Sequence, residues 1–489
     1  MTAPSGGGAP RRASVPGGGN VPEAGNVPRA GSATVGGGAG RRGHAVVLGA
    51  SVAGLLAARV LAEHVGQVTV IDRDDVTPTA AAGHRGGAAQ GRHLHALMER
   101  GRQILDELYP DFTAKIAADG VPTAETLVGT RWYFDGARVT PVPTGLTSVL
   151  ASRPALEAAL RAATLGHDRI RLLPGLRAVG LVRGSGSTRA AGVVGVRVEP
   201  PAGDAPARTV EADLVVDATG RGSRASEWLA DLGFDIPREE TVGVDLAYAS
   251  RTYRRWPTDL GGDLGVIIST LPGRRGGGAV AQEGDRWIVT LAGMLGDHPP
   301  VDAPGYERFA ASLPAPDIHR LIQDAEPLDD PVRYRFRASR RLRYDLLHTP
   351  AAGFVAIGDA LCTLNPLYAQ GMTVAAQQAL ELRACLRSGS LDDLAARYFT
   401  AAARPTSRAW SIATDSDLRY REVEGRRGPR TRITNAYIPR VQAATRSDPV
   451  LARNLLRVVN LVEPPSILLT PAAMLRSARH ALGTRRSRS

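Results

Sequence analysis

The segment from residue 45 to residue 72 carries the pattern that most constrains the fold of this chain. An apolar run at 45–48 leads into a glycine-containing turn, a helical pattern at 55–62 and a second apolar run at 68–71. Continuous apolar runs of this length suit strands that are buried on both faces, as in a parallel sheet. The order therefore predicts a strand–turn–helix–strand unit of an α/β fold.

The turn at 49–54 has the glycines that let a backbone pass close to a phosphate. Gly49 permits the tight turn after the first strand, and Gly54 lets the helix approach that strand. The free N–H groups at the start of the helix then face a pyrophosphate. Asp72, after the second strand, is placed to accept hydrogen bonds from ribose hydroxyls. Ser51 replaces the usual middle glycine but is small enough to admit a dinucleotide, and the turn alone does not decide between FAD and NAD.

Two later segments repeat the pattern of an apolar strand that ends in a glycine turn. The first runs from 212 to 224, and the second runs from 353 to 360. The second segment continues through residues 365–372 into a long helical pattern.

Together the three segments resemble the group A superfamily of flavoprotein monooxygenases, which includes aromatic hydroxylases, squalene epoxidase and bacterial epoxidases of polyether biosynthesis. The resemblance covers residues 44–390 and implies that the cofactor is FAD. In this family the Gly-Asp turn binds the ribityl chain and the pyrophosphate, so Gly358 and Asp359 are expected in that role. The second segment usually has Asp-Gly in the family, whereas this chain has Thr219-Gly220, as the polyether epoxidases do.

The segment after the Gly-Asp turn is expected to border the flavin ring. A helix that begins at Gly371 and Met372 presents the positive end of its dipole, which stabilises the negative charge of a reduced flavin. Pro366 fixes a turn without offering an N–H group, which suits a wall packed on the isoalloxazine ring. These three residues are therefore candidates for the cofactor site.

Two arginines complete the expected cofactor site. Family members place an arginine after the second strand near the flavin, and Arg92, in the Gln-Gly-Arg-His-Leu-His stretch 90–95, is the candidate by resemblance. His93 and His95 in the same stretch are interpreted as loop contacts rather than catalytic groups. Arg153 opens a helix at a position that related flavoproteins place close to the cofactor, and a plain helix start is an equally weighted alternative.

Short β-rich runs separated by glycine turns fill the region 240–345 and predict an antiparallel sheet. Family members place such a sheet over the flavin as a substrate lobe, so the cofactor domain is expected to be discontinuous. Six aromatic residues are candidates for the wall of an apolar pocket, although each taken alone is more often core: Trp132, Tyr133, Phe134, Tyr248, Tyr253 and Trp256.

The expected fold class is α/β: a Rossmann-like FAD-binding domain of the glutathione-reductase type, an inserted antiparallel β-sheet substrate domain and a helical C-terminal layer. An apolar stripe within 451–459, capped by Asp448, predicts that this layer packs on the core rather than on a membrane. The expected boundaries are a disordered Gly/Pro/Ala-rich tail at 1–43, the FAD-binding domain at 44–130, 151–233 and 346–390, the substrate domain at 131–150 and 234–345, C-terminal helices at 391–475 and a basic tail at 476–489.

The net charge of +12 does not indicate a nucleic-acid partner. The segments 1–43 and 473–489 carry +4 and +5 of that charge, and aromatic residues, which stack on bases, make up only 5% of the chain. Cys362 and Cys385 are too few and too far apart for a disulfide framework or a zinc site, which fits a reducing, cytoplasmic setting. No apolar run has the length of a membrane span.

The resemblance implies a FAD-dependent monooxygenase, an epoxidase or hydroxylase that acts through a flavin C4a-hydroperoxide. The flavin carries this chemistry, so no catalytic side chain and no metal ligand is assigned. Electrons would come from NADPH or from a partner flavin reductase, and O2 is the other substrate. The protein would supply a dry cavity for a hydrophobic polyketide- or terpenoid-like molecule of natural-product biosynthesis.

Three alternatives stay open on the sequence. Thr219 in place of the family's Asp is compatible with a [4+2] cyclase that uses FAD structurally, without redox turnover. A flavin-dependent halogenase is disfavoured, because the chain has no Trp-x-Trp-x-Ile-Pro segment and its only lysine, Lys115, lies in a different context. A flavin-linked reductase or dehydrogenase is the third alternative.

Overall fold

The computed structural model describes residues 43–77, 85–185, 191–201 and 206–486. These residues belong to the second of two units into which the chain divides, residues 41–489. The tail predicted at 1–43 lies outside the described residues, apart from Gly43, and so do the last three residues of the predicted basic tail.

Helices and strands of the described ranges are labelled in chain order. The helices are α1 Val52–Leu61, α2 Glu99–Leu108, α3 Phe112–Ala118, α4 Arg153–Leu165, α5 Ala225–Asp231, α6 Ala303–Ala311, α7 Asp317–Gln323, α8 Gly371–Ser388, α9 Leu394–Asp417, α10 Pro429–Ala444, α11 Pro449–Val459 and α12 Pro471–Arg486. The strands are β1 His44–Leu48, β2 Gln67–Ile71, β3 Thr123–Glu125, β4 Arg131–Phe134, β5 Ala137–Arg138, β6 Thr147–Val149, β7 Ile170–Leu173, β8 Arg177–Arg183, β9 Val193–Glu199, β10 Arg208–Glu211, β11 Leu214–Asp217, β12 Arg238–Arg254, β13 Gly265–Ile268, β14 Arg275–Gln282, β15 Arg286–Met294, β16 Val332–Arg343, β17 Phe354–Ala356 and β18 Cys362–Thr363.

A five-stranded parallel sheet forms the centre of the predicted cofactor domain, in the order β17-β11-β1-β2-β7. Strands β17, β11, β1 and β2 are almost wholly buried because helices such as α1 cover them, which explains their continuous apolar sequences, whereas the edge strand β7 is only partly buried. The three strands that end in glycine turns, β1, β11 and β17, are neighbours. Their turns therefore meet at one edge of the sheet, and the predicted α/β fold class is confirmed.

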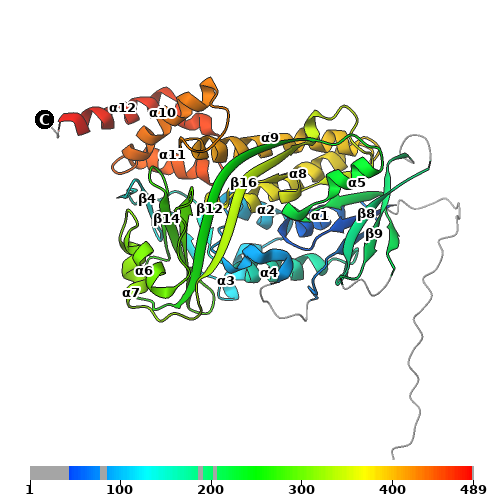
Figure 1. Cartoon of the computed structure of the whole chain (residues 1–489), viewed down its shortest axis with the longest axis horizontal. Helices are drawn as coiled ribbons and strands as arrows, with labels where there is room; N and C mark the ends of the chain where they lie inside the picture. Colours follow the sequence, from blue (N-terminus) through cyan, green and yellow to red (C-terminus); the bar gives the residue numbers. More distant parts are fainter. Residues whose placement is uncertain (1–42, 78–84, 186–190, 202–205, 487–489) are drawn as a thin grey trace, which may run out of the picture. The chain divides into compact units, whose positions relative to one another are not determined.

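An eight-stranded sheet, in the order β18-β16-β12-β15-β14-β13-β4-β5, lies next to the cofactor region. All its neighbouring pairs are antiparallel except β13 with β4, so the predicted antiparallel sheet is present. Figure 1 shows that β12 and β16 run side by side from the α1 and α5 region to the α6 and α7 region. The short strand β18 pairs with β16 and follows directly on the Gly-Asp turn, so this turn is attached to the large sheet. Two small sheets, β10-β9-β8 and β3-β6, complete the strands.

The C-terminal helices form the predicted helical layer. Helices α8 and α9 lie side by side, and α10, α11 and α12 gather near one end of α9 (Figure 1). Asp448 caps α11 by accepting the N–H groups of Val450 and Leu451 at 2.9 and 3.0 Å. The apolar stripe of α11 packs with side chains of the 139–146 segment, as predicted for core. Residues 476–486 of the predicted basic tail continue α12. Within the described ranges, no helix is both long and apolar enough to cross a membrane.

Candidate functional site

A single large cavity of about 1800 Å³ extends from the glycine turns at the edge of the parallel sheet to helices α9–α11. Eleven of the thirteen residues predicted to hold the cofactor line this cavity: Gly49, Ser51, Asp72, Arg153, Thr219, Gly220, Gly358, Asp359, Pro366, Gly371 and Met372. The fold thus gathers positions that are more than 300 residues apart in the chain, as Gly49 and Met372 are. Gly54 and Arg92 do not line it.

The turn after β1 accepts only glycine at two positions. Gly49 has a φ of +103°, and a Cβ there would lie 2.6 Å from the carbonyl oxygen of Ala218. A Cβ on Gly54 would lie 1.8 Å from the carbonyl oxygen of Gly49, so Gly54 serves the helix–strand packing that was predicted for it. Ser51 and the first residues of α1 border the cavity, where the first N–H groups of a helix have no intrahelical acceptor.

The serine in place of the middle glycine is part of a buried hydrogen-bond network. Its hydroxyl donates to Glu157 Oε1 and accepts a hydrogen bond from Arg153 Nη2 at 2.9 Å. Arg153 also donates through Nε to Glu157 Oε1 at 2.7 Å, one turn further along α4. Ser152 caps this helix by accepting the N–H of Ala155. Arg153 is therefore both a first-turn residue and a member of the cavity wall.

A second arginine, Arg85, connects the same network to the end of β2. Its guanidinium donates to Glu157 Oε2 at 2.7 Å and to Asp72 Oδ2 at 3.3 Å. Asp72 also accepts the N–H of Ala50 at 2.7 Å, which fixes its carboxylate beside the turn. Burial by itself would raise the pKa of Glu157, but the positive charges of Arg153 and Arg85 hold that pKa at about 2. Neither Arg85 nor the carboxylate of Glu157 was predicted for the site.

The arginine predicted after the second strand lies elsewhere. Arg92 ends the 3-10 helix Gly86–Arg92, its side chain is exposed, and it does not border the cavity. Arg85, which immediately precedes this 3-10 helix, and Gln90 within it do border the cavity. The structure thus offers Arg85, rather than Arg92, as the arginine of this segment that faces the cofactor turn.

Thr219 does not present its hydroxyl to the cavity as a free group. The hydroxyl and the N–H of Thr219 both donate to Asp217 Oδ1, at 2.6 and 2.9 Å. Asp217 is fully buried at the end of β11, and burial raises its pKa. Gly220 follows with a φ of +76°, which favours glycine. A neutral side chain thus stands where the resembling family usually has a carboxylate.

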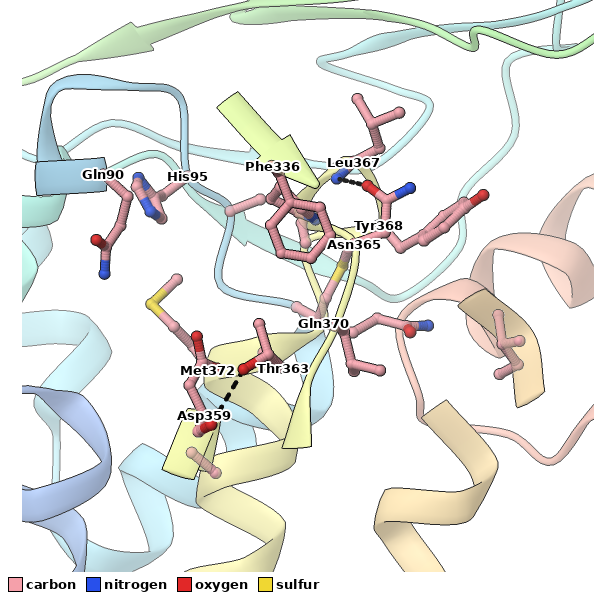
Figure 2. A pocket seen from close by; sticks show the side chains of 18 of the residues that line it. Gln90, His95, Phe336, Asp359, Thr363, Asn365, Leu367, Tyr368, Gln370 and Met372 are labelled. Carbon is pink, nitrogen blue, oxygen red and sulfur yellow. Dashed lines mark hydrogen bonds between the residues drawn. The ribbon is translucent and has the colours of Figure 1, made fainter. Parts of the chain in front are cut away.

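The Gly-Asp turn after β17 places a carboxylate in the cavity. Gly358 has a φ of +66° and donates its N–H to Gln378 Oε1 at 2.7 Å. The half-buried Asp359 faces Arg221 at 3.9 Å, and its backbone carbonyl accepts the hydroxyl of Thr363 (Figure 2). Burial raises the pKa of Asp359, while the positive charges of Arg221 and Arg153 oppose this shift.

The loop before α8 is fastened to α9 through one buried carboxylate. Asn365 Nδ2 and the hydroxyl of Tyr368 donate to Asp417 Oδ1 at 2.8 and 2.7 Å. Asn365 also accepts the N–H of Leu367, which closes the turn around Pro366 (Figure 2). Burial raises the pKa of Asp417 to about 7, although these two hydrogen bonds lower it. In Figure 2 the Tyr368 ring points away from His95 and Gln90.

The two histidines of the 90–95 stretch face different surroundings, as an extended segment requires. His93 is buried and shares a hydrogen bond of 2.8 Å between its Nδ1 and the hydroxyl of Ser250 in the large sheet. His95 borders the cavity, and its Nδ1 lies 2.9 Å from the carbonyl oxygen of His93, which makes this nitrogen the donor. Burial and the nearby Arg153 lower the pKa of His95 to about 3, so its ring is neutral.

Aromatic side chains of the large sheet line the middle of the cavity. Trp132, Tyr133, Phe134 and Tyr248 do so as predicted. The other two candidates do not border the cavity: Tyr253 is buried within the sheet's own core, the alternative kept for each of these rings, and Trp256 is 59% exposed beyond the end of β12. Two further rings come from β16, a strand that was not predicted, and they are Tyr334 and Phe336. The rings of Tyr248 and Tyr334 stack at 5.1 Å.

The residues at the sheet end of the cavity fit FAD. Arginines outnumber acids there, which suits a pyrophosphate with two negative charges: the arginines are 73, 85, 153, 177, 221 and 224, and the acids are Asp72, Glu199 and Asp359. The glycine turns and the first turn of α1 add backbone N–H groups to this set. Within the described residues, no group of three or more His, Cys, Asp or Glu side chains is arranged to hold a metal ion.

Comparison with known proteins places the chain in a family. No family model matches it. Protein Rv3254 of Mycobacterium tuberculosis is 33% identical over 463 residues, which cover 91% of this chain and 96% of that protein. Kynurenine 3-monooxygenase of Salinispora arenicola is 27% identical over 404 residues, 78% of this chain and 81% of that protein. The solved structure of the flavin-dependent brominase Bmp2 shares the fold, with a TM-score of 0.61, 14% identity and coverage of 91% of this chain and 100% of that one. The chain belongs to the FAD-dependent monooxygenase superfamily of oxidoreductases, and within it to a family that it shares with Protein Rv3254.

Proposed function

We propose that the chain is a FAD-dependent monooxygenase that inserts one oxygen atom into a hydrophobic polyketide- or terpenoid-like substrate, by epoxidation or hydroxylation. The observation that carries this proposal is the continuous cavity of about 1800 Å³, which joins the dinucleotide turn to a chamber walled by aromatic and aliphatic side chains. A site for one small ligand occupies roughly 300–1000 Å³. The cavity therefore has room for FAD and a large apolar molecule together.

The FAD chain is assigned to the end of the cavity at the parallel sheet. The pyrophosphate would be bound by the turn at Gly49 and Ser51, by the first N–H groups of α1 and by the guanidinium of Arg153. Asp72 would accept hydrogen bonds from the adenosine ribose, and Asp359 from the ribityl hydroxyls. Both carboxylates border the cavity, which supports these roles.

The flavin ring is assigned to the loop 365–370 and the start of α8. When bound, FAD supplies the activation of O2 and the transfer of one oxygen atom. The chain's own residues would then stabilise negative charge through the N-terminus of α8, at Gly371 and Met372, and wall the ring with Pro366. His95 would offer its unprotonated Nε2 as a hydrogen-bond acceptor. The aromatic walls would exclude water from the reacting atoms.

Replacing Asp359 by alanine is expected to weaken FAD binding at least tenfold while the protein stays folded. The carboxylate would lose its hydrogen bonds to the cofactor, each worth about 1.5–3 kcal/mol when a charged group is involved. Its half-buried 3.9 Å pair with Arg221 contributes little to stability. FAD titration by fluorescence, together with the thermal midpoint of the apoprotein, measures both effects. Asp330→Ala, an exposed residue outside the cavity wall, is the control; a tightly loaded, yellow Asp359→Ala protein contradicts the assignment.

Two other activities on the same fold are less well supported. Halogenases of this fold use a lysine in the pocket, whereas Lys115 of this chain lies on α3, donates to the carbonyl oxygen of Pro110 and does not border the cavity. A [4+2] cyclase that keeps FAD as a structural group draws support from Thr219, because its hydroxyl is committed to Asp217 and no carboxylate occupies the position. The cyclase is therefore retained as the second candidate.

This assignment gives each part of the chain a proposed role. Residues 44–130, 151–233 and 346–390 would bind FAD, residues 131–150 and 234–345 would bind the substrate, and the helices after 390 would close the cavity. A reducing, cytoplasmic location is proposed because Cys362 and Cys385 are both buried, unpaired thiols.

The direct test of the proposed activity is reduction and reoxidation of the FAD-loaded protein in air. Flavin absorbance is expected to bleach on addition of NADPH, or of NADPH with a flavin reductase, and to recover as O2 is consumed. Oxygen-18 from labelled O2 is then expected in the product of an apolar alkene or aromatic substrate. A product that is an isomer of its substrate, formed without O2 uptake, would instead establish the cyclase.

A further inference from the structure

The end of the cavity away from the dinucleotide turn has one charged wall. Helix α9 presents Arg408, Ser411 and Asp415 to the cavity, and the turn after the helix adds Arg419. Their spacing of three, four and four residues places them on one face of a helical segment. The opposite face of α9 is buried in the core, and this stripe forms the polar face of the helix.

Aliphatic side chains line the same end of the cavity. Helices α10 and α11 contribute Ile438, Leu455 and Val458, and the following loop adds Leu468. Leu455, Val458 and Leu468 belong to a buried hydrophobic cluster, with Ile438 packed against it. This end of the cavity is therefore amphipathic, because both arginines and aliphatic side chains line it.

The arginines of the polar wall are not held in ion pairs. Among the residues that the structure describes, neither Arg408 nor Arg419 makes an ion pair, although the charge of Asp135 acts on Arg419. The same holds for Arg430 at the start of α10, which borders the cavity but is exposed. Arg419 donates to the neutral Gln442 Oε1 at 2.9 Å, and burial lowers its pKa. The acid between them, Asp415, accepts the hydroxyl of Thr431 at 2.8 Å. Half-buried guanidinium groups that lack a carboxylate are costly unless a ligand brings the anion.

The charged wall has a fixed place relative to the loop that is proposed to border the flavin ring. Asp417, which lies on α9 between Asp415 and Arg419, accepts hydrogen bonds from Asn365 and Tyr368 of that loop. A molecule held at Arg419 therefore lies close to this loop, and its apolar part has room among the aliphatic side chains of the same end of the cavity.

We infer that the substrate is an amphipathic oxyanion, whose carboxylate or phosphate head is bound by Arg408 and Arg419 and whose apolar body lies among the aliphatic side chains of the cavity beside the loop 365–370. An uncharged hydrocarbon would leave both half-buried guanidinium groups without an anion. The inference rests on the proposed function for the reaction that follows, but it concerns only how the substrate is recognised.

Three 12-carbon probes that differ only in the head group test the inference on the FAD-loaded protein: dodecanoate, dodecyl phosphate and 1-dodecanol. Their Kd values are measured below the micellar range by the change in flavin fluorescence and by calorimetry. At least one anion is expected to bind ten or more times tighter than the alcohol, since charge-assisted hydrogen bonds are the strong ones. The better of the two anions identifies the head group as carboxylate or phosphate.

Variants of single side chains decide whether these arginines are responsible. Arg419→Gln and Arg408→Gln are each expected to reduce the preference for the anion at least fivefold, Arg419→Lys to keep most of it, and Asp415→Asn to increase it. Arg404→Gln, an exposed residue of α9 outside the cavity wall, is the matched control and is expected to change nothing. FAD content and thermal midpoint establish that each variant is folded.

The inference is overturned if the alcohol binds as tightly as both anions, or if Arg404→Gln lowers the preference as much as Arg419→Gln does. Failure of the proposed function gives a different result: the anion preference persists, but no labelled oxygen reaches a product. Conversely, oxygen transfer without any head-group preference would reject the anion site and leave the monooxygenase proposal intact.

Discussion

Gly54→Val is expected to yield a protein that neither binds FAD nor folds stably. A Cβ at this position would lie 1.8 Å from the carbonyl oxygen of Gly49, a backbone atom that is held in the turn after β1. Relief would require separating α1 from β1, whose packing faces are fully buried. Overpacking a core typically costs about 1–3 kcal/mol and occasionally more, and a clash with a fixed backbone atom belongs to the severe cases. The displaced turn would no longer admit a pyrophosphate.

The measurement is the FAD content and the thermal midpoint of the purified variant. Gly243→Ala is the matched control, because a Cβ at Gly243 would meet no atom within 4 Å and the residue does not have a positive φ. This control is expected to retain full FAD and a wild-type midpoint. A folded Gly54→Val protein with normal FAD content would show that the turn after β1 does not hold the cofactor.

The cofactor end of the cavity was predictable because its signals are local. Each of the strands β1, β11 and β17 is an uninterrupted apolar run followed by a glycine turn, and parallel pairing then brings the three turns together. Positions such as Gly49 and Gly358 are set by backbone conformation, with φ values of +103° and +66°. A positive φ favours glycine, so positions with this conformation can be recognised in the amino-acid sequence.

The side-chain network behind the turn was not predictable in the same way. Arg85 and Glu157 are 72 residues apart, and their 2.7 Å pair depends on the packing of α4 against the 3-10 helix Gly86–Arg92. Glu157 did carry one local signal, since it follows Arg153 by one helical turn. Arg92 was the candidate because it stands in the segment that resembles the family, and Arg85 was not considered. The 3-10 helix after Arg85 turns Arg92 outward.

The errors in the substrate region have a geometric origin. Strand β16 was not predicted individually, although its alternation of arginines with Val332, Tyr334 and Phe336 is the period-2 pattern of a half-buried strand. Tyr253 follows Tyr248 by five residues on β12, and an odd separation places the two rings on opposite faces of the sheet. Which side chains of α9 line the cavity depends on the rotation of this helix about its own axis, and tertiary packing sets that rotation.

Asp417→Asn is expected to abolish a large part of the pH dependence of stability between about pH 5 and pH 8. The folded-state pKa of Asp417 is raised from 3.8 to about 7, so between these two pH values the native state retains a proton that the unfolded chain has already released. Stability contributed by this group is present at low pH and is lost as pH rises toward 7. Each pH unit corresponds to about 1.4 kcal/mol, which gives a total loss of roughly 2–4 kcal/mol.

Asparagine should preserve the local structure while removing the titration. Its carbonyl oxygen can accept the same hydrogen bonds from Asn365 and Tyr368, and its amide replaces the buried Oδ2, for which the described residues supply no hydrogen-bond partner. The variant is therefore expected to equal the wild type near pH 4 and to exceed it in unfolding free energy at pH 8. Denaturant unfolding at both pH values measures the difference. Asp415→Asn, two residues earlier and half-buried beside the cavity, makes the same chemical change and is expected to keep the wild-type pH dependence; equal behaviour of the two variants would mean that the buried carboxylate of Asp417 does not hold the extra proton.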